Sequence, residues 1–132
     1  MYLVQKLPDT QEERGMNVKK CYEIMNGDYE DVKGRFLTDE RIRRFALLFL
    51  GDGSMEDLRA AMRNKDCEKG FLAAHTLKGI CLNLGFTGLY MPVCRITEML
   101  RERDYESAAV EMPAVETAFD ATIRGLRELE NI

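Results

Sequence analysis

The chain of 132 residues lacks tryptophan, and it has only three prolines and one histidine. It also lacks a long apolar run, because the longest, residues 45–50, is far shorter than the ~20 residues of a membrane-spanning helix. The first residues, MYLVQKLPDTQ, have no apolar core of the kind that a signal peptide needs. These absences predict a cytoplasmic protein that does not enter a membrane.

A surplus of positive charge is absent too. The chain has 19 Lys and Arg against 23 Asp and Glu, which gives a formal net charge of −4. Domains that bind nucleic acids usually present a basic face. We therefore expect no nucleic-acid partner.

Long stretches that alternate between polar and apolar residues, as strands do, are missing from the sequence. Apolar residues instead recur at helical spacing between short breaks. The sequence thus predicts an all-α protein, an antiparallel four-helix bundle with short additional N-terminal helices. We expect an N-terminal extension in residues 1–15 and the bundle domain in residues 16–132. The four bundle helices are expected to begin near Thr38, Asp66, Thr87 and Ala114.

Polar residues and glycines mark the expected helix ends. Asn17 and Asp66 precede apolar-patterned segments, as N-caps do, and residues 54–57 match a capping box. Gly85 is expected to end the helix that follows Asp66. Pro113 is expected to kink the final helical stretch.

The four cysteines, Cys21, Cys67, Cys81 and Cys94, lack the CxxC spacing of metal sites. They fall largely on apolar helical positions, which predicts buried, reduced thiols. Two alternatives stay open. One is a zinc site of Cys67, Cys81 and Cys94 with His75, and the other is an enzyme that uses Cys67 or Cys81 with His75. Two spacings disfavour them: His75 and Cys81 project from different faces of one helix, and Cys67 lies two turns from His75.

The histidine lies in a segment with two distinct faces, residues 71–85. At about 100° per residue, its core-facing stripe comprises Ala73, Ala74, Leu77, Cys81 and Leu84. His75 lies nearly opposite this stripe. Lys78 follows one turn along on the same face, and Gly79 at i+4 leaves the ring uncrowded. The remaining residues of this outer face are apolar: Phe71, Leu72 and Leu82.

The run His75-Thr76-Leu77-Lys78-Gly79, followed by Asn83-Leu84-Gly85, resembles the histidine-containing phosphotransfer (HPt) domain family. The likeness extends over roughly residues 28–129. It implies a four-helix bundle in which the histidine helix and its successor bear the active face.

The resemblance also implies a function, that of a phosphocarrier in a multistep two-component phosphorelay. His75 would accept a phosphoryl group on Nε2 from an aspartate of one receiver domain and pass it to another receiver. Lys78 would stabilise the phosphoryl group, and Gly79 would let the partner approach. The partner would dock on the apolar residues of the outer face, Phe71, Leu72 and Leu82.

Motifs for independent catalysis are missing, since the chain has no Walker loop and no kinase signature. We therefore expect no enzyme and no bound cofactor, with Mg²⁺ supplied by the partner. The expected partners are receiver domains of hybrid histidine kinases and response regulators, and the expected state is a monomer. An alternative is a receiver-docking module of the same fold that is not phosphorylated.

One departure from the family concerns the helix after Gly85. Many members place Gln or Glu there, facing the histidine. Counting from Gly85, that position is Thr97 in this chain, with Glu98 beside it. A threonine hydroxyl has a shorter reach than these side chains, but it still donates and accepts hydrogen bonds. We therefore expect Thr97 to give polar support to the ring or the phosphoryl group.

Overall fold

The computed structural model describes residues 15–132, and within this range it contains helices and no strand. The predicted N-terminal extension, residues 1–15, lies outside the described residues except for Gly15. The helices are α1 (Val18–Ile24), α2 (Tyr29–Phe36), α3 (Asp39–Leu47), the 3₁₀ helix η1 (Leu48–Gly51), α4 (Ser54–Arg63), α5 (Cys67–Leu84), α6 (Thr87–Arg101) and α7 (Tyr105–Glu130).

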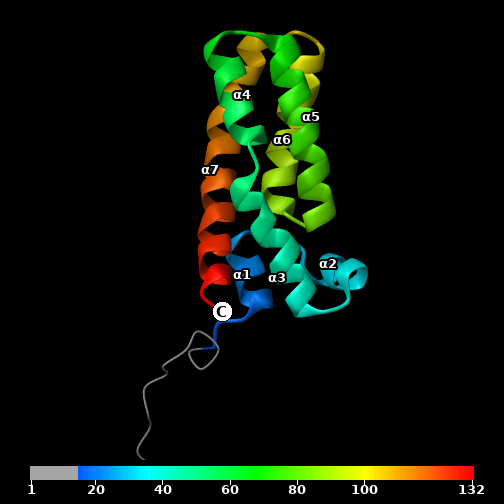
Figure 1. The fold of residues 1–132 in the computed structure, drawn as a ribbon. Helices are drawn as coiled ribbons and strands as arrows, with labels where there is room; N and C mark the ends of the chain where they lie inside the picture. Colours follow the sequence, from blue (N-terminus) through cyan, green and yellow to red (C-terminus); the bar gives the residue numbers. More distant parts are fainter. Residues whose placement is uncertain (1–14) are drawn as a thin grey trace, which may run out of the picture.

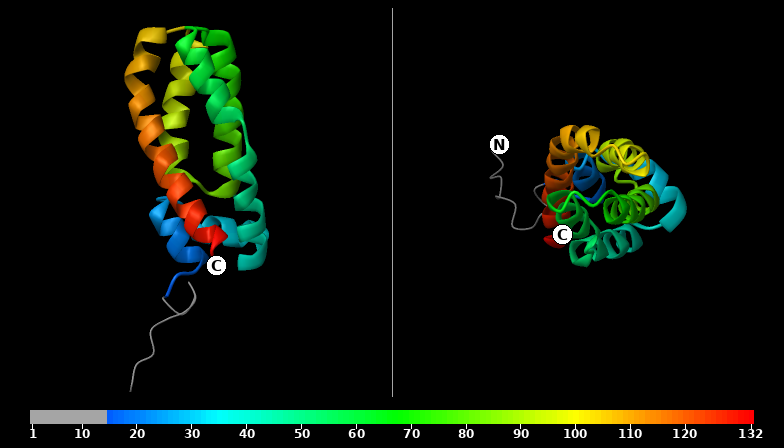
Figure 2. Two further views of the ribbon diagram at one scale, coloured as in Figure 1. Left: turned by 60° about the vertical axis from the view of Figure 1, so that its left-hand side comes forward. Right: turned by 90° about the horizontal axis from the view of Figure 1, so that it is seen from above.

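The bundle is antiparallel, as predicted, but one of its four columns is divided (Figure 1). Helices α5, α6 and α7 each fill a column. The fourth column consists of α3 and, above it, α4, with η1 between them, whereas the sequence predicted α3 alone (Figure 2). Helices α1 and α2 pack at the lower end of the bundle. No helix in residues 15–132 is long and apolar enough to cross a membrane.

The expected caps of α1 and α5 are confirmed. The Asn17 side chain accepts a hydrogen bond from the Lys20 N–H, and the Asp66 side chain accepts one from the Lys69 N–H. Gly85 ends α5 in the left-handed conformation, with φ of 68°. Local hydrogen bonds of this kind depend on residues only three positions apart, which is why the sequence is sufficient to predict them.

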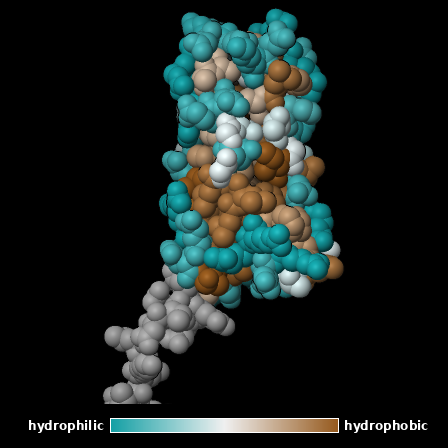
Figure 3. Space-filling view, viewed as in Figure 1, coloured by the Kyte–Doolittle hydropathy of each residue, from teal (hydrophilic) through white to brown (hydrophobic). Residues whose placement is uncertain are grey.

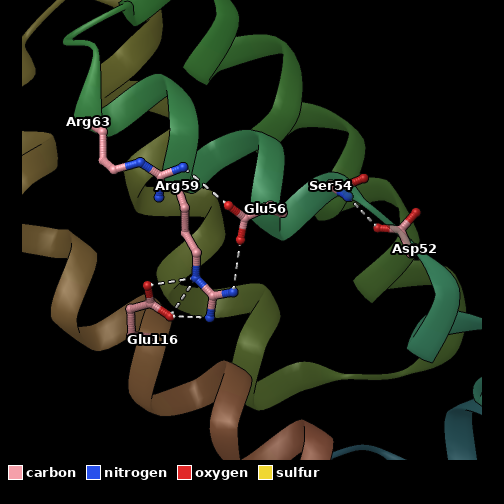
Figure 4. Close-up of polar contacts among 6 residues, drawn as sticks. All are labelled: Asp52, Ser54, Glu56, Arg59, Arg63 and Glu116. Atoms are coloured by element: carbon pink, nitrogen blue, oxygen red, sulfur yellow. Dashed lines mark hydrogen bonds and ion pairs between the residues drawn. The ribbon is translucent and has the colours of Figure 1, made fainter.

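The predicted capping box at residues 54–57 is wrong. Ser54 lies inside α4, and the N-cap is Gly53, which has no side chain to accept a hydrogen bond. The Asp52 carboxylate does so instead, 2.8 Å from the Ser54 nitrogen (Figure 4). The first N–H group of α4 is thus hydrogen-bonded by a residue that precedes the predicted capping box.

The final helical stretch, expected from Asp104, and the bundle helix, expected from Ala114, form one helix. Helix α7 runs without a break from Tyr105 to Glu130 and includes Pro113, although the bundle helix was expected to begin at Ala114. Pro113 is exposed. The carbonyl that it leaves without a helical partner therefore has access to water, and the helix can continue.

Side chains of α4 hold α7 in the upper half of the bundle. Arg59 donates to both carboxylate oxygens of Glu116, with the shortest contact at 2.7 Å (Figure 4). The Arg59 guanidinium also lies 5.0 Å from the centroid of the Phe119 ring. On α4 itself, Glu56 pairs with Arg59 and Arg63. These contacts connect the divided column to α7.

The N-terminal helices fix the turn between α5 and α6. The Tyr22 hydroxyl donates to the Leu84 carbonyl at 2.7 Å, and the Asp28 N–H donates to the Gly85 carbonyl at 2.8 Å. The Arg35 guanidinium also donates to the last carbonyls of α5. Phe86, at the turn, has no exposed surface. The hairpin of α5 and α6 is therefore held from below by α1 and α2.

Apolar side chains gather on the middle of the face seen in Figure 1, as Figure 3 shows. The exposed apolar residues of α3 and η1 include Phe45 and Leu48. They line a groove of about 230 Å³ together with Ile80 and Leu84 of α5. Ile80 lies about 140° from His75 around the helix axis. This groove therefore lies on a different flank of α5 from the histidine.

Candidate functional site

The two faces of α5 are as the sequence predicts. Ala74, Leu77 and Cys81 are completely buried, whereas His75 is exposed. The reason is the helical period, since the stripe that packs against the other columns places the histidine nearly opposite. The imidazole is thus accessible from solvent at the middle of a long helix.

Phe71 is the neighbour of His75 one turn earlier on the same helix. The two rings are stacked, with centroids 5.6 Å apart and an angle of 20° between their planes. Among the described residues, none donates a hydrogen bond to the imidazole or accepts one from it. Phe71 is half-buried, so only part of its ring is accessible from solvent.

Charged residues of α6 lie beside this stack. Arg101 Nε donates to Glu98 at 3.0 Å, and the Arg101 guanidinium lies 4.6 Å from the centroid of the Phe71 ring. The hydrogen bonds from Arg101 lower the pKa of Glu98, and the nearby Lys78 and His75 lower it further. Glu98 therefore stays ionised at neutral pH, next to two cationic side chains.

The structure corrects the prediction for Thr97. This residue is completely buried, and its hydroxyl donates to the Val93 carbonyl at 2.6 Å, within α6. A buried threonine in a helix satisfies its only donor in this way when no other acceptor is near. The exposed polar residue on this part of α6 is Glu98, one position further along.

Gly79 has open space around it. A Cβ atom at this position would meet no heavy atom within 4 Å, apart from those of its own helix backbone and chain neighbours. Close packing of a neighbouring helix therefore does not explain the glycine at this position. Leu72 and Leu82 each have 58% of their surface exposed.

The thiol hypotheses are wrong. Within residues 15–132 no three His, Cys, Asp or Glu side chains are grouped closely enough to hold a metal ion, which excludes the zinc site of Cys67, His75, Cys81 and Cys94. Cys81 is completely buried, and burial raises the pKa of its thiol strongly. A buried, protonated thiol on another face of α5 cannot act with His75 as a nucleophile. Cys67 lies eight residues before His75 on the same helix, about 12 Å along its axis, which is beyond hydrogen-bond reach.

The assembled site comprises one exposed imidazole, the lysine Lys78, and an ion pair of Arg101 and Glu98 on the adjacent helix. A neutral imidazole leaves one ring nitrogen with a free lone pair, which makes it a nucleophile toward phosphorus. Arg101 was not among the predicted site residues. Its spacing of three residues from Glu98 was the available signal, because residues at i and i+3 share a helix face.

Comparison with known proteins identifies a family. The model of the family described as Hpt domain matches residues 51–128, which is more than half of the chain. The matched range contains α4, α5, α6 and most of α7, and with them every residue of the site. Searches among curated proteins and among solved structures found no match.

Proposed function

Because the chain belongs to the Hpt domain family, whose members are phosphocarrier modules, we propose that His75 carries a phosphoryl group between two receiver domains of a phosphorelay. The observation that supports this most directly is the exposure of the imidazole in the middle of α5, opposite its core stripe. In this proposal the chain is a carrier and has no catalytic turnover of its own. Its four unpaired thiols suit the reducing cytoplasm.

The chemical step is a substitution at phosphorus. Nε2 of a neutral His75 ring attacks the phosphorus of an aspartyl phosphate on the receiver, and the N–P bond forms as the P–O bond to the aspartate breaks. The aspartate leaves as a carboxylate anion. The ring keeps its proton on Nδ1, so the product is an imidazolium bearing a phosphoryl group. Transfer to the second receiver reverses these bond changes.

Lys78 and the two exposed leucines have separate roles in this proposal. Lys78 follows His75 by one turn, where its ammonium can offset the charge of the phosphoryl oxygens. Leu72 and Leu82 provide the apolar surface on which receivers of hybrid kinases and response regulators dock. The Mg²⁺ ion that phosphoryl transfer needs is held by the receiver in this proposal.

The test is transfer of label from a phosphorylated receiver to the folded chain in the presence of Mg²⁺. We expect label on the chain that is labile in acid and stable in base, as a phosphohistidine is. If none of several receivers transfers label, the carrier proposal is wrong. Binding of those receivers without labelling would support the alternative, a receiver-docking module that is not phosphorylated.

The substitution Gly79→Ala separates stability from function. Alanine is favoured over glycine in an exposed helix interior by about 1 kcal/mol, and no neighbour opposes the new methyl group, so the free energy of unfolding should rise by about that amount. The methyl group also enters the surface that the receiver approaches. Because misplacement by ~1 Å costs up to about a hundredfold in rate, we expect transfer to slow by about tenfold.

Urea unfolding and the initial rate of labelling measure these two effects on one sample. Gly53, an exposed glycine at the N-cap of α4 where an added Cβ would meet no heavy atom within 4 Å, offers the control Gly53→Ala. That variant should leave the transfer rate unchanged. Transfer at the wild-type rate by a stabilised Gly79→Ala variant would contradict the assigned role of Gly79.

A further inference from the structure

We infer that Phe71 is a positioning residue that sets the plane of the His75 imidazole, and that Arg101 holds Phe71 in place. This inference rests on the proposed function and adds residues that act through His75. It reassigns Phe71, which the sequence predicted to be a docking residue.

The first step is the contact between the two rings. Phe71 and His75 are four residues apart on α5, so their side chains lie one above the other. Their centroids are 5.6 Å apart and their planes differ by 20°. Since no hydrogen bond from the described residues orients the imidazole, this stack is the contact that limits its rotation.

The second step is the support behind Phe71. Arg101 of α6 lies 4.6 Å from the Phe71 ring centroid, a distance at which a guanidinium and an aromatic face attract each other. Two hydrogen bonds of 3.0 Å and 3.3 Å to Glu98 hold the guanidinium itself. A continuous chain of contacts thus leads from Glu98 through Arg101 and Phe71 to the imidazole.

The consequence concerns the direction of the ring nitrogen. Attack on phosphorus needs the lone pair of the nitrogen in line with the bond that breaks. The lone pair lies in the plane of the imidazole, so rotation of that plane turns it away from the phosphorus. The stack with Phe71 restricts this rotation before the receiver binds. The imidazole is then already oriented for attack, which lowers the entropic cost of the transfer step.

The test compares Phe71→Leu with Phe71→Tyr. Leucine keeps an apolar side chain but removes the flat ring, whereas tyrosine keeps the ring. We expect Phe71→Leu to lower the transfer rate at saturating receiver by about tenfold, and Phe71→Tyr to stay within about twofold of wild type. The concentration of receiver that gives half the maximal rate should change little in either variant.

Two further variants separate positioning from docking. Leu72→Ala removes an exposed contact, so it should raise the half-saturating receiver concentration and leave the limiting rate less affected. Arg101→Met keeps an unbranched stem but removes the guanidinium, so it should lower the limiting rate in the same direction as Phe71→Leu. If Phe71→Leu instead behaves as Leu72→Ala does, Phe71 is a docking residue and the inference is wrong.

A measurement on the chain alone keeps this inference distinct from the proposed function. In the NMR spectrum, the stacked Phe71 ring shifts the His75 ring protons, and this shift should disappear in Phe71→Leu and persist in Phe71→Tyr and Leu72→Ala. The inference fails if Phe71→Leu leaves those resonances unchanged, whatever the receivers do.

A small phosphoryl donor provides a second test, one that needs no receiver. Phosphoramidate phosphorylates imidazole without a receiver, because the ring nitrogen attacks its phosphorus while the P–N bond breaks and ammonia leaves. We expect phosphoramidate to label the wild type and Phe71→Leu at similar rates, because a small donor can approach the exposed ring from any direction. A loss of phosphoramidate labelling of about tenfold in Phe71→Leu would contradict positioning toward the receiver. Labelling by phosphoramidate without labelling by any receiver would count against the relay and not against positioning.

Discussion

The His75→Gln variant is expected to accept no phosphoryl group from any receiver. Glutamine has no ring nitrogen with a nucleophilic lone pair, and the chain has no second histidine that could take over. His75 is exposed and makes no hydrogen bond to the described residues, so its loss should not disturb the bundle. Labelling by a phosphorylated receiver, with circular dichroism as the check of folding, measures the effect.

The control for this variant lies on another helix. Val110 of α7 has 82% of its surface exposed, and Val110→Gln introduces the same side chain away from the site. We expect wild-type labelling of Val110→Gln. Acid-labile label that persists on His75→Gln would mean that another residue accepts the phosphoryl group, and the assignment of His75 would be wrong.

The second large effect is a loss of stability in Phe86→Ala. Phe86 is completely buried at the turn between α5 and α6, and its ring centroid lies 5.3 Å from that of Phe49 and 6.0 Å from that of Tyr22. Removing a buried phenyl ring leaves a cavity and typically costs about 3–5 kcal/mol of the free energy of unfolding. We expect a loss in this range, measured by urea unfolding.

A half-buried phenylalanine provides the comparison. Phe36 of α2 stacks on Phe45, with centroids 5.1 Å apart, at the edge of the fold. Phe36→Ala should cost clearly less than Phe86→Ala, because less apolar surface returns to water. Equal losses in the two variants would show that the turn does not depend on the burial of Phe86.

The sequence was sufficient for features that depend on near neighbours. The face of His75 follows from the helical period alone, and the caps at Asn17 and Asp66 need only a polar side chain three residues before its donor. The left-handed end of α5 follows from Gly85, the residue type that adopts this conformation most easily. The predicted face of α5 and the caps of α1 and α5 therefore needed no knowledge of the rest of the chain.

Features that depend on packing between helices were not predictable in the same way. Counting from Gly85 placed Thr97 at the position expected to face His75. The rotation of α6 against its neighbours instead buries Thr97 and exposes Glu98. The joining of α3 and α4 into one column likewise depends on the packing of α4 against α5 and on the contacts of Arg59 with α7. Arg101 became a site residue only because α6 places its guanidinium over the Phe71 ring of α5.

The anchoring of the α5–α6 turn has a consequence for where this protein can be cut. The family match begins at residue 51, yet the groups that bind the Leu84 and Gly85 carbonyls come from Tyr22 and Asp28. A fragment excised at the family boundary would leave both carbonyls without these donors and would uncover one side of Phe86. Anyone who grafts this module into a fusion protein should therefore place the junction before α1. The packed bundle thus includes helices that lie outside the range that the family model matches.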